Sequence, residues 1–107
     1  MDLLVEVYTV TAKYPAEERY GLAAHTRRSA VSISSNIAEG YARHSRAEYV
    51  RHVQIAYGSA AELESQLLAA NRLGFIASTQ GRVFELNAEV ERMLASLRRS
   101  LLTRSTP

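Results

Sequence analysis

One group of side chains in this sequence has the spacing of metal ligands. His44, Glu48 and His52 lie four residues apart, which would place all three on one face of a continuous helix. However, Ser45 followed three residues later by Glu48 is typical of a helix N-terminus, where each side chain bonds the other residue's backbone N–H. That capping box would leave His44 outside the helix and give Glu48 a partner. We therefore expect no metal site and no cofactor.

The sequence contains no recognisable catalytic group. It has no cysteine, which excludes thiol nucleophiles and thiolate metal sites. No serine lies in a Gly-x-Ser-x-Gly turn, and no glycine-rich phosphate loop occurs. We expect no catalytic residues and a protein that is not an enzyme.

Arginines form two concentrations along the chain. Arginine pairs bidentately with phosphate, so such a group is a candidate for binding RNA or DNA. The alternative is a solvated surface, or compensation of helix dipoles by arginines near helix ends. The net charge of only +2 is weak evidence for a polyanionic partner. The candidate nucleic-acid-binding residues are Arg27, Arg28, Arg43, Arg46 and Arg51, and the second concentration is Arg92, Arg98, Arg99 and Arg104.

A polar motif lies in the sequence between Arg28 and Arg43. Asn36 and Glu39 are three residues apart, and Gly40 follows them, while Gly58 interrupts a later helical pattern. A glycine inside a helix costs about 1 kcal/mol relative to alanine, so we expect another element to press against Gly58. Asn36 and Glu39 would then be partly buried and hydrogen-bonded. We interpret the four residues as a structural motif; a binding role is the alternative.

The apolar residues recur three and four apart almost throughout, which predicts helices and no strands. Short connections would make consecutive helices antiparallel. The sequence therefore predicts an all-α, up-down-up-down four-helix bundle. The predicted helices cover residues 2–13, residues 22–41, a third helix capped by Ser45 and stopped by Gly74, and a fourth capped by Ser78 or Thr79 that reaches at least Leu101.

The third predicted helix has more apolar surface than one core requires. A second stripe lies about a quarter turn from the first, and in a lone bundle part of it would face water. We expect this stripe to be an interface between copies of the chain; the alternative is that neighbouring helices cover it. Its members are Val50, Tyr57, Ala61 and Leu68.

Length and composition limit the organisation of the molecule. The chain has 107 residues, 47% of them hydrophobic, which predicts a single domain over residues 1–107. The first residues are acidic where a signal peptide is basic, and no apolar run approaches the roughly 18 residues of a membrane span. We expect a cytoplasmic protein that does not enter a membrane.

The sequence resembles the bacterial 23S rRNA intervening-sequence proteins, also called four helix bundle proteins. The resemblance extends from Leu4 to Leu101 and is densest in residues 18–22, 27–33, 35–40 and 58–67. It implies an antiparallel four-helix bundle that assembles as a homopentamer around a central channel. The chain is also similar to the accessory proteins of diversity-generating retroelements, which implies RNA or DNA and a protein as further partners. The resemblance provides no active site.

Overall fold

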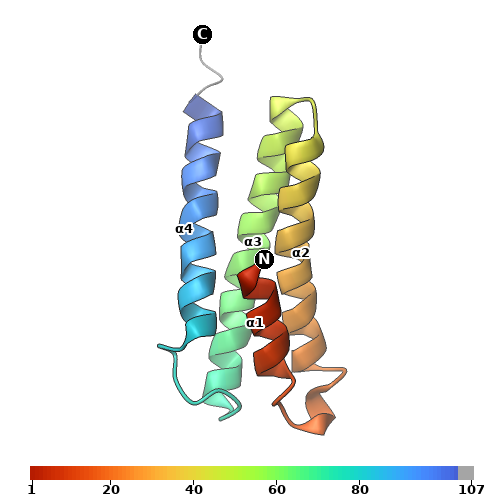
Figure 1. Ribbon diagram of the computed structural model, residues 1–107, viewed down its shortest axis with the longest axis vertical. Helices are drawn as coiled ribbons and strands as arrows, with labels where there is room; N and C mark the ends of the chain where they lie inside the picture. Colours follow the sequence, from red (N-terminus) through yellow and green to blue (C-terminus); the bar gives the residue numbers. More distant parts are fainter. Residues whose placement is uncertain (104–107) are drawn as a thin grey trace.

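Four α-helices that alternate in direction form the described part of the chain (Figure 1). The computed structural model describes residues 1–103, and the prediction of an all-α four-helix bundle is confirmed. A short 3-10 turn, η1, joins the first two helices. Helix α1 is much shorter than the others, so it lies along only one half of the bundle. The elements are α1 (Asp2–Thr11), η1 (Ala16–Glu18), α2 (Leu22–Ala42), α3 (Arg46–Arg72) and α4 (Arg82–Thr103).

The core consists of the apolar stripes that the periodicity predicts. On α3, six residues of the predicted stripe are fully buried: Val53, Ala56, Ala60, Leu63, Leu67 and Ala70. Leu3 and Val7 of α1 and Leu94 and Leu101 of α4 form one core cluster with the first five of these residues, whereas Ala70 packs with Tyr14 and Ala23. Tyr41, an apolar residue at the end of the predicted helix over residues 22–41, is 80% exposed. Burial of Gly40 turns the next side chain out towards solvent.

Local chemistry fixes both ends of α3. The Glu48 N–H donates to Oγ of Ser45 at 3.2 Å, which confirms Ser45 as the N-cap. Within residues 1–103 the return bond from the Ser45 N–H to the Glu48 carboxylate is absent, so only half of the predicted capping box forms. At the other end Gly74 has a φ of 84°, and the Phe75 N–H donates to the Ala70 carbonyl at 2.8 Å. This is the glycine-terminated helix end that the sequence predicts.

The ends of α1 and α4 differ from the predictions. Helix α1 stops at Thr11, two residues early, and the chain turns before Pro15. Helix α4 begins only at Arg82, so capping by Ser78 or Thr79 is wrong. The Ser78 hydroxyl accepts a hydrogen bond from the Gln80 N–H at 3.0 Å, in the turn before the helix. Serine favours such local turns as readily as helix caps.

The entry into α2 has a cap that the sequence did not reveal. The Leu22 N–H donates to Oε1 of Glu18 at 3.0 Å, so the last residue of η1 satisfies the first turn of α2. A carboxylate near a helix N-terminus also interacts favourably with the helix dipole. The connection between α1 and α2 is thereby tied to the helix that follows it.

Helices α2 and α3 are in close contact at Gly40. A Cβ atom at this position would lie 2.9 Å from Cβ of His52 and 3.1 Å from Cδ1 of Tyr49. Gly58, in contrast, is exposed, and apart from its chain neighbours and the backbone of its own helix no atom of the described residues lies within 4 Å of a Cβ built there. The expectation that an element of the same chain presses against Gly58 is therefore wrong. Its position on α3 faces away from α2 and from the core.

We expect alanine substitutions to separate the two glycines. Gly40→Ala should lower the free energy of unfolding by about 1–3 kcal/mol, because the methyl group collides with α3. Gly58→Ala should raise it by about 0.5–1 kcal/mol, because an exposed helix position gains propensity without a clash. Denaturant unfolding of both variants measures the difference. Equal effects of the two substitutions would contradict the assigned contact.

Tyr14 is a buried polar side chain between α1 and α2. It is 7% exposed, its ring centroid lies 5.4 Å from that of Phe75, and within the described residues its hydroxyl has no hydrogen-bond partner. Burial raises the pKa of Tyr14 to about 12. The hydroxyl therefore stays protonated in the folded protein at pH values where it ionises in the unfolded chain.

We expect Tyr14→Phe to stabilise the protein by about 1 kcal/mol at pH 7, because it removes a buried hydroxyl without a partner. The wild type should also lose stability as pH rises from about 10 towards the folded-state pKa of about 12, because only the unfolded state ionises Tyr14 readily there. The Tyr14→Phe variant should not show this loss of stability with rising pH. Urea unfolding of both proteins at pH 7, 10 and 11.5 tests the expectation; a destabilised variant would mean that the hydroxyl has a partner.

Candidate functional site

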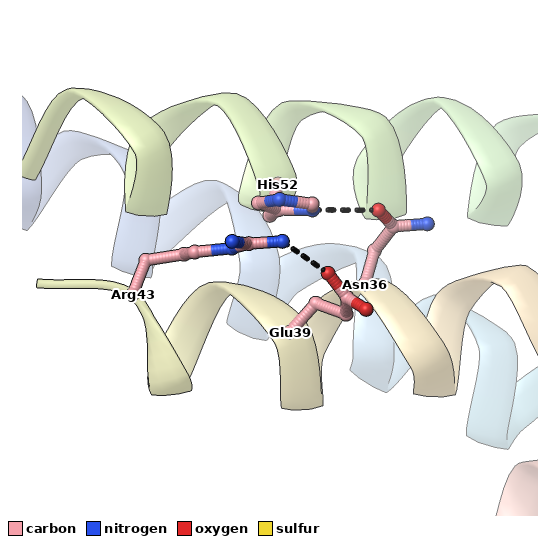
Figure 2. Close-up of polar contacts among 4 residues, drawn as sticks. All are labelled: Asn36, Glu39, Arg43 and His52. Atoms are coloured by element: carbon pink, nitrogen blue, oxygen red, sulfur yellow. Dashed lines mark hydrogen bonds and ion pairs between the residues drawn. The ribbon is translucent and has the colours of Figure 1, made fainter. Parts of the chain in front are cut away.

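A polar chain links α2 and α3 beside Gly40 (Figure 2). Nδ1 of His52 lies 2.9 Å from Oδ1 of Asn36, whose Nδ2 donates to the Ser32 carbonyl at 2.8 Å. The amide oxygen can only accept, so this network assigns the proton to Nδ1 of His52. Oγ of Ser32 in turn lies 2.7 Å from Oγ of Ser59 on α3. Asn36 is thus a half-buried, hydrogen-bonded group, as the motif predicts.

Glu39 does not have the burial that the motif predicts. Its side chain is 54% exposed and forms an ion pair with Arg43, with Oε2 and Nη2 2.7 Å apart (Figure 2). The reason is helix geometry: burial of Gly40 leaves the preceding residue beside the interface rather than in it. An exposed pair four residues apart contributes only about 0.3–0.5 kcal/mol. The pair does, however, offset the charge of one candidate arginine.

Arg27 contributes to the packing of α1 on α2. Its Nε donates to Oγ1 of Thr11 at 2.7 Å, and its Nη2 donates to the Tyr8 carbonyl at 3.4 Å. The guanidinium carbon lies 4.6 Å from the centroid of the Tyr8 ring. Arg28, the next residue, is exposed, and its Nη1 lies 3.2 Å from Nδ1 of His25. These two arginines lie near the start of α2.

The remaining candidate arginines lie at the other end of the bundle. Arg43 ends α2, and Arg46 and Arg51 lie in the first turns of α3. Sixteen residues along α2 correspond to about 24 Å, so these arginines do not form one cluster with Arg27 and Arg28. The five candidate arginines therefore lie in two separate regions of the fold, not in the single patch that the sequence predicts.

The same end receives the second arginine concentration. Helix α4 finishes at the same end of the bundle as the connection between α2 and α3 (Figure 1). Its last turns include Arg98 and Arg99, both exposed, whereas Arg104 lies outside the described residues. We call the group at this end the arginine end; it consists of Arg43, Arg46, Arg51, Arg98 and Arg99. The sequence alone did not predict this group, because its members come from opposite halves of the chain.

The second apolar stripe of α3 is largely uncovered. Tyr57 and Leu68 are 40% and 43% exposed, and Ala61 is also exposed. Val50 differs, because it is half-buried and packs against the core. Neighbouring helices therefore cover Val50 but not the other three residues of the stripe.

Tyr57 lies in a groove between α3 and α4. One part of the groove, of about 550 Å³, is lined by Gln54, Tyr57, Ala95, Arg98 and Arg99. An adjoining part of about 290 Å³ shares Tyr57 and Ala95 and continues to Glu64 and Glu91. The groove therefore combines an aromatic side chain and small apolar residues with charged groups of both signs. This combination of an apolar centre and charged margins is common in protein interfaces.

Two carboxyl groups line this groove, and a buried amide contacts one of them. The pKa of Glu91 is raised by partial burial, and further by the charge of Glu64 and a hydrogen bond with it. Nδ2 of Asn87 donates to the Ala60 carbonyl at 3.1 Å and to Oε1 of Glu91 at 3.3 Å. Asn87 is 1% exposed, and its Oδ1 has no partner within the described residues. Sequence reasoning missed this cluster, since nothing in the spacing predicts a buried polar contact between α3 and α4.

Two negative findings apply to residues 1–103. No three His, Cys, Asp or Glu side chains lie close enough together to hold a metal ion. In the same residues, no helix combines the length and the apolar composition that crossing a membrane requires.

Comparisons with known proteins agree with the resemblance seen in the sequence. A solved structure from Bacteroides thetaiotaomicron, a protein of unknown function from the S23 ribosomal protein family, matches with a TM-score of 0.73. The two chains are 24% identical, and the match covers 89% of this chain and 87% of the other, which shows the fold. No curated protein matches. The family model of the 23S rRNA-intervening sequence protein matches residues 1–96. This chain therefore belongs to the 23S rRNA-intervening sequence protein family.

Proposed function

We propose that this protein is a non-enzymatic, homo-oligomeric scaffold or adaptor that binds RNA or DNA through the arginine end. The observation that carries the proposal is that the end of α2, the start of α3 and the end of α4, each of which carries arginines, lie at one end of the bundle. In an oligomer this group is repeated, which multiplies a weak positive field into one that attracts a polyanion. A cytoplasmic location fits such a partner.

Self-association would use the part of the groove between α3 and α4 that Tyr57, Glu64 and Glu91 line, which does not include Arg98 or Arg99. Tyr57 is half exposed there, and tyrosine is enriched at the centres of protein interfaces. Leu68 and Ala61 extend the apolar surface along α3. We propose a pentamer, the assembly that the resemblance to intervening-sequence proteins implies.

A protein-interaction module without affinity for nucleic acid is the second candidate function. The Glu39–Arg43 ion pair favours it, because it offsets part of the positive charge at the arginine end. In that case the groove beside Tyr57 would receive another protein or another copy, and the arginines would only solvate the surface.

We expect the protein to bind structured RNA with an affinity that falls steeply as salt increases, because binding to phosphates releases counterions. The triple variant Arg43→Gln, Arg46→Gln, Arg51→Gln should reduce the salt slope by about 0.7–0.9 for each phosphate that the variant no longer neutralises. Fluorescence anisotropy across a series from about 50 to 200 mM salt measures both effects.

The matched control is Arg28→Gln, Arg72→Gln, Arg82→Gln, which removes the same charge from exposed positions outside the arginine end. It should retain most of the affinity. Equal losses of affinity in both triple variants would exclude a localised surface. No binding by the wild type at about 50 mM salt would favour the protein-interaction module.

We expect the wild type to behave as a pentamer and Tyr57→Glu to dissociate it, because burial of a carboxylate in an apolar interface is unfavourable. Tyr20→Glu is the control, since Tyr20 is 87% exposed and lies outside the stripe. Light scattering at micromolar concentration measures both masses. A monomeric wild type would exclude self-association, and an intact oligomer of the Tyr57 variant would exclude this interface.

A further inference from the structure

A second hollow lies away from the arginine end, where α1 turns into α2. It has a volume of about 350 Å³ and is lined by the end of α1, the connection around Pro15 and the first turns of α2. Arg19 and Arg27 are the charged residues in its wall, and of the described residues no Asp or Glu lines it. The wall of the hollow therefore carries two positive charges and, among the described residues, no negative one.

Arg27 is held in a fixed position at this hollow. Oγ1 of Thr11 accepts from its Nε at 2.7 Å and itself donates to the Val7 carbonyl at 2.7 Å. Thr11 is 3% exposed, so the acceptor is part of the buried packing. The Tyr8 ring, 4.6 Å from the guanidinium carbon, supports the face of the guanidinium group. These contacts leave Nη1 without a partner in the described residues, and they reduce the entropy that Arg27 would lose on binding a ligand.

We propose that this hollow binds a phosphate group through Arg19 and Arg27. A phosphate monoester carries a charge of about −1.5 to −2 at pH 7, which two arginines match. The planar donors of a guanidinium group pair with two phosphate oxygens at once. The volume is near the lower limit of about 300 Å³ for small-molecule sites, which favours a small phosphorylated compound over a large cofactor. The site uses neither Arg43, Arg46 nor Arg51, so it stands independently of the proposed nucleic-acid surface.

The most direct test is an NMR titration of the full chain with inorganic phosphate. Chloride replaces phosphate in the reference titration at equal ionic strength, which removes the general effect of salt. We expect saturable shifts of the Thr11 and Ala23 amides and of the Arg27 Nε–H as phosphate reaches about 10 mM, a range that detects millimolar affinity. Shifts that are absent, unsaturated or identical in chloride would overturn the proposal.

Arg19→Gln is the principal variant, because Arg19 is exposed and its removal leaves the packing of α1 unchanged. Removal of one charge-assisted hydrogen bond should weaken phosphate binding about tenfold. Arg27→Lys, a second variant, keeps the charge but lacks the planar donors and should also weaken binding. Arg72→Gln, an exposed arginine on α3, is the control and should bind as the wild type does. Unchanged affinity in both Arg19→Gln and Arg27→Lys would overturn the assignment.

Two further titrations identify the source of the phosphate. Adenosine 5′-monophosphate supplies a free monoester, and a short single-stranded oligonucleotide supplies backbone phosphates. Shifts at Thr11 and Arg27 with the monoester would support a small-molecule ligand. Shifts there with the oligonucleotide alone would support the site with a nucleic-acid backbone as its ligand. The proposal would be overturned if neither ligand caused a saturable shift at Thr11 and Arg27.

Discussion

The close contact between α2 and α3 at Gly40 is the constraint on which the rest of the structure depends. Helix α2 is rich in small and β-branched residues and has low intrinsic stability, so tertiary packing must hold it. The glycine allows α3 to approach to a distance that a methyl group would prevent. The Asn36–His52 hydrogen bond then fixes the register of the two helices. The position of the α2–α3 connection, and thus of Arg43 and Arg46, follows from this contact.

Helix α3 presents different chemistry to each of its neighbours. Towards α2 it offers Ser59 and His52, which complete a polar chain, while its central stripe is fully apolar. Towards α4 it carries Tyr57 and Glu64, and this side remains open. Glu64 and Glu91 both line this open groove, and partial burial together with the neighbouring Glu64 raises the pKa of Glu91. The groove thus differs from an ordinary solvated helix face, which supports its assignment as an interface.

Local signals in the sequence were enough for the helices and for both ends of α3. Ser45 and Gly74 act through bonds to residues a few positions away, so their roles can be predicted without the fold. The sequence could not predict the candidate sites in this way, because they are formed by tertiary contacts. Spacing could not reveal that Gly40, rather than Gly58, faces another helix. Nor could it reveal that Arg27 bonds Thr11 on α1, because nothing in a linear pattern specifies a partner 16 residues away.

We propose above all that nucleic acid contacts the arginine end of the bundle. Hydrogen–deuterium exchange of the full chain, with and without a structured RNA, tests it most directly, because backbone amides report the contact surface segment by segment. We expect slower exchange in residues 42–51 and 96–103 and no change around residues 16–28. Slower exchange confined to residues 16–28, or no change anywhere at low salt, would contradict the claim.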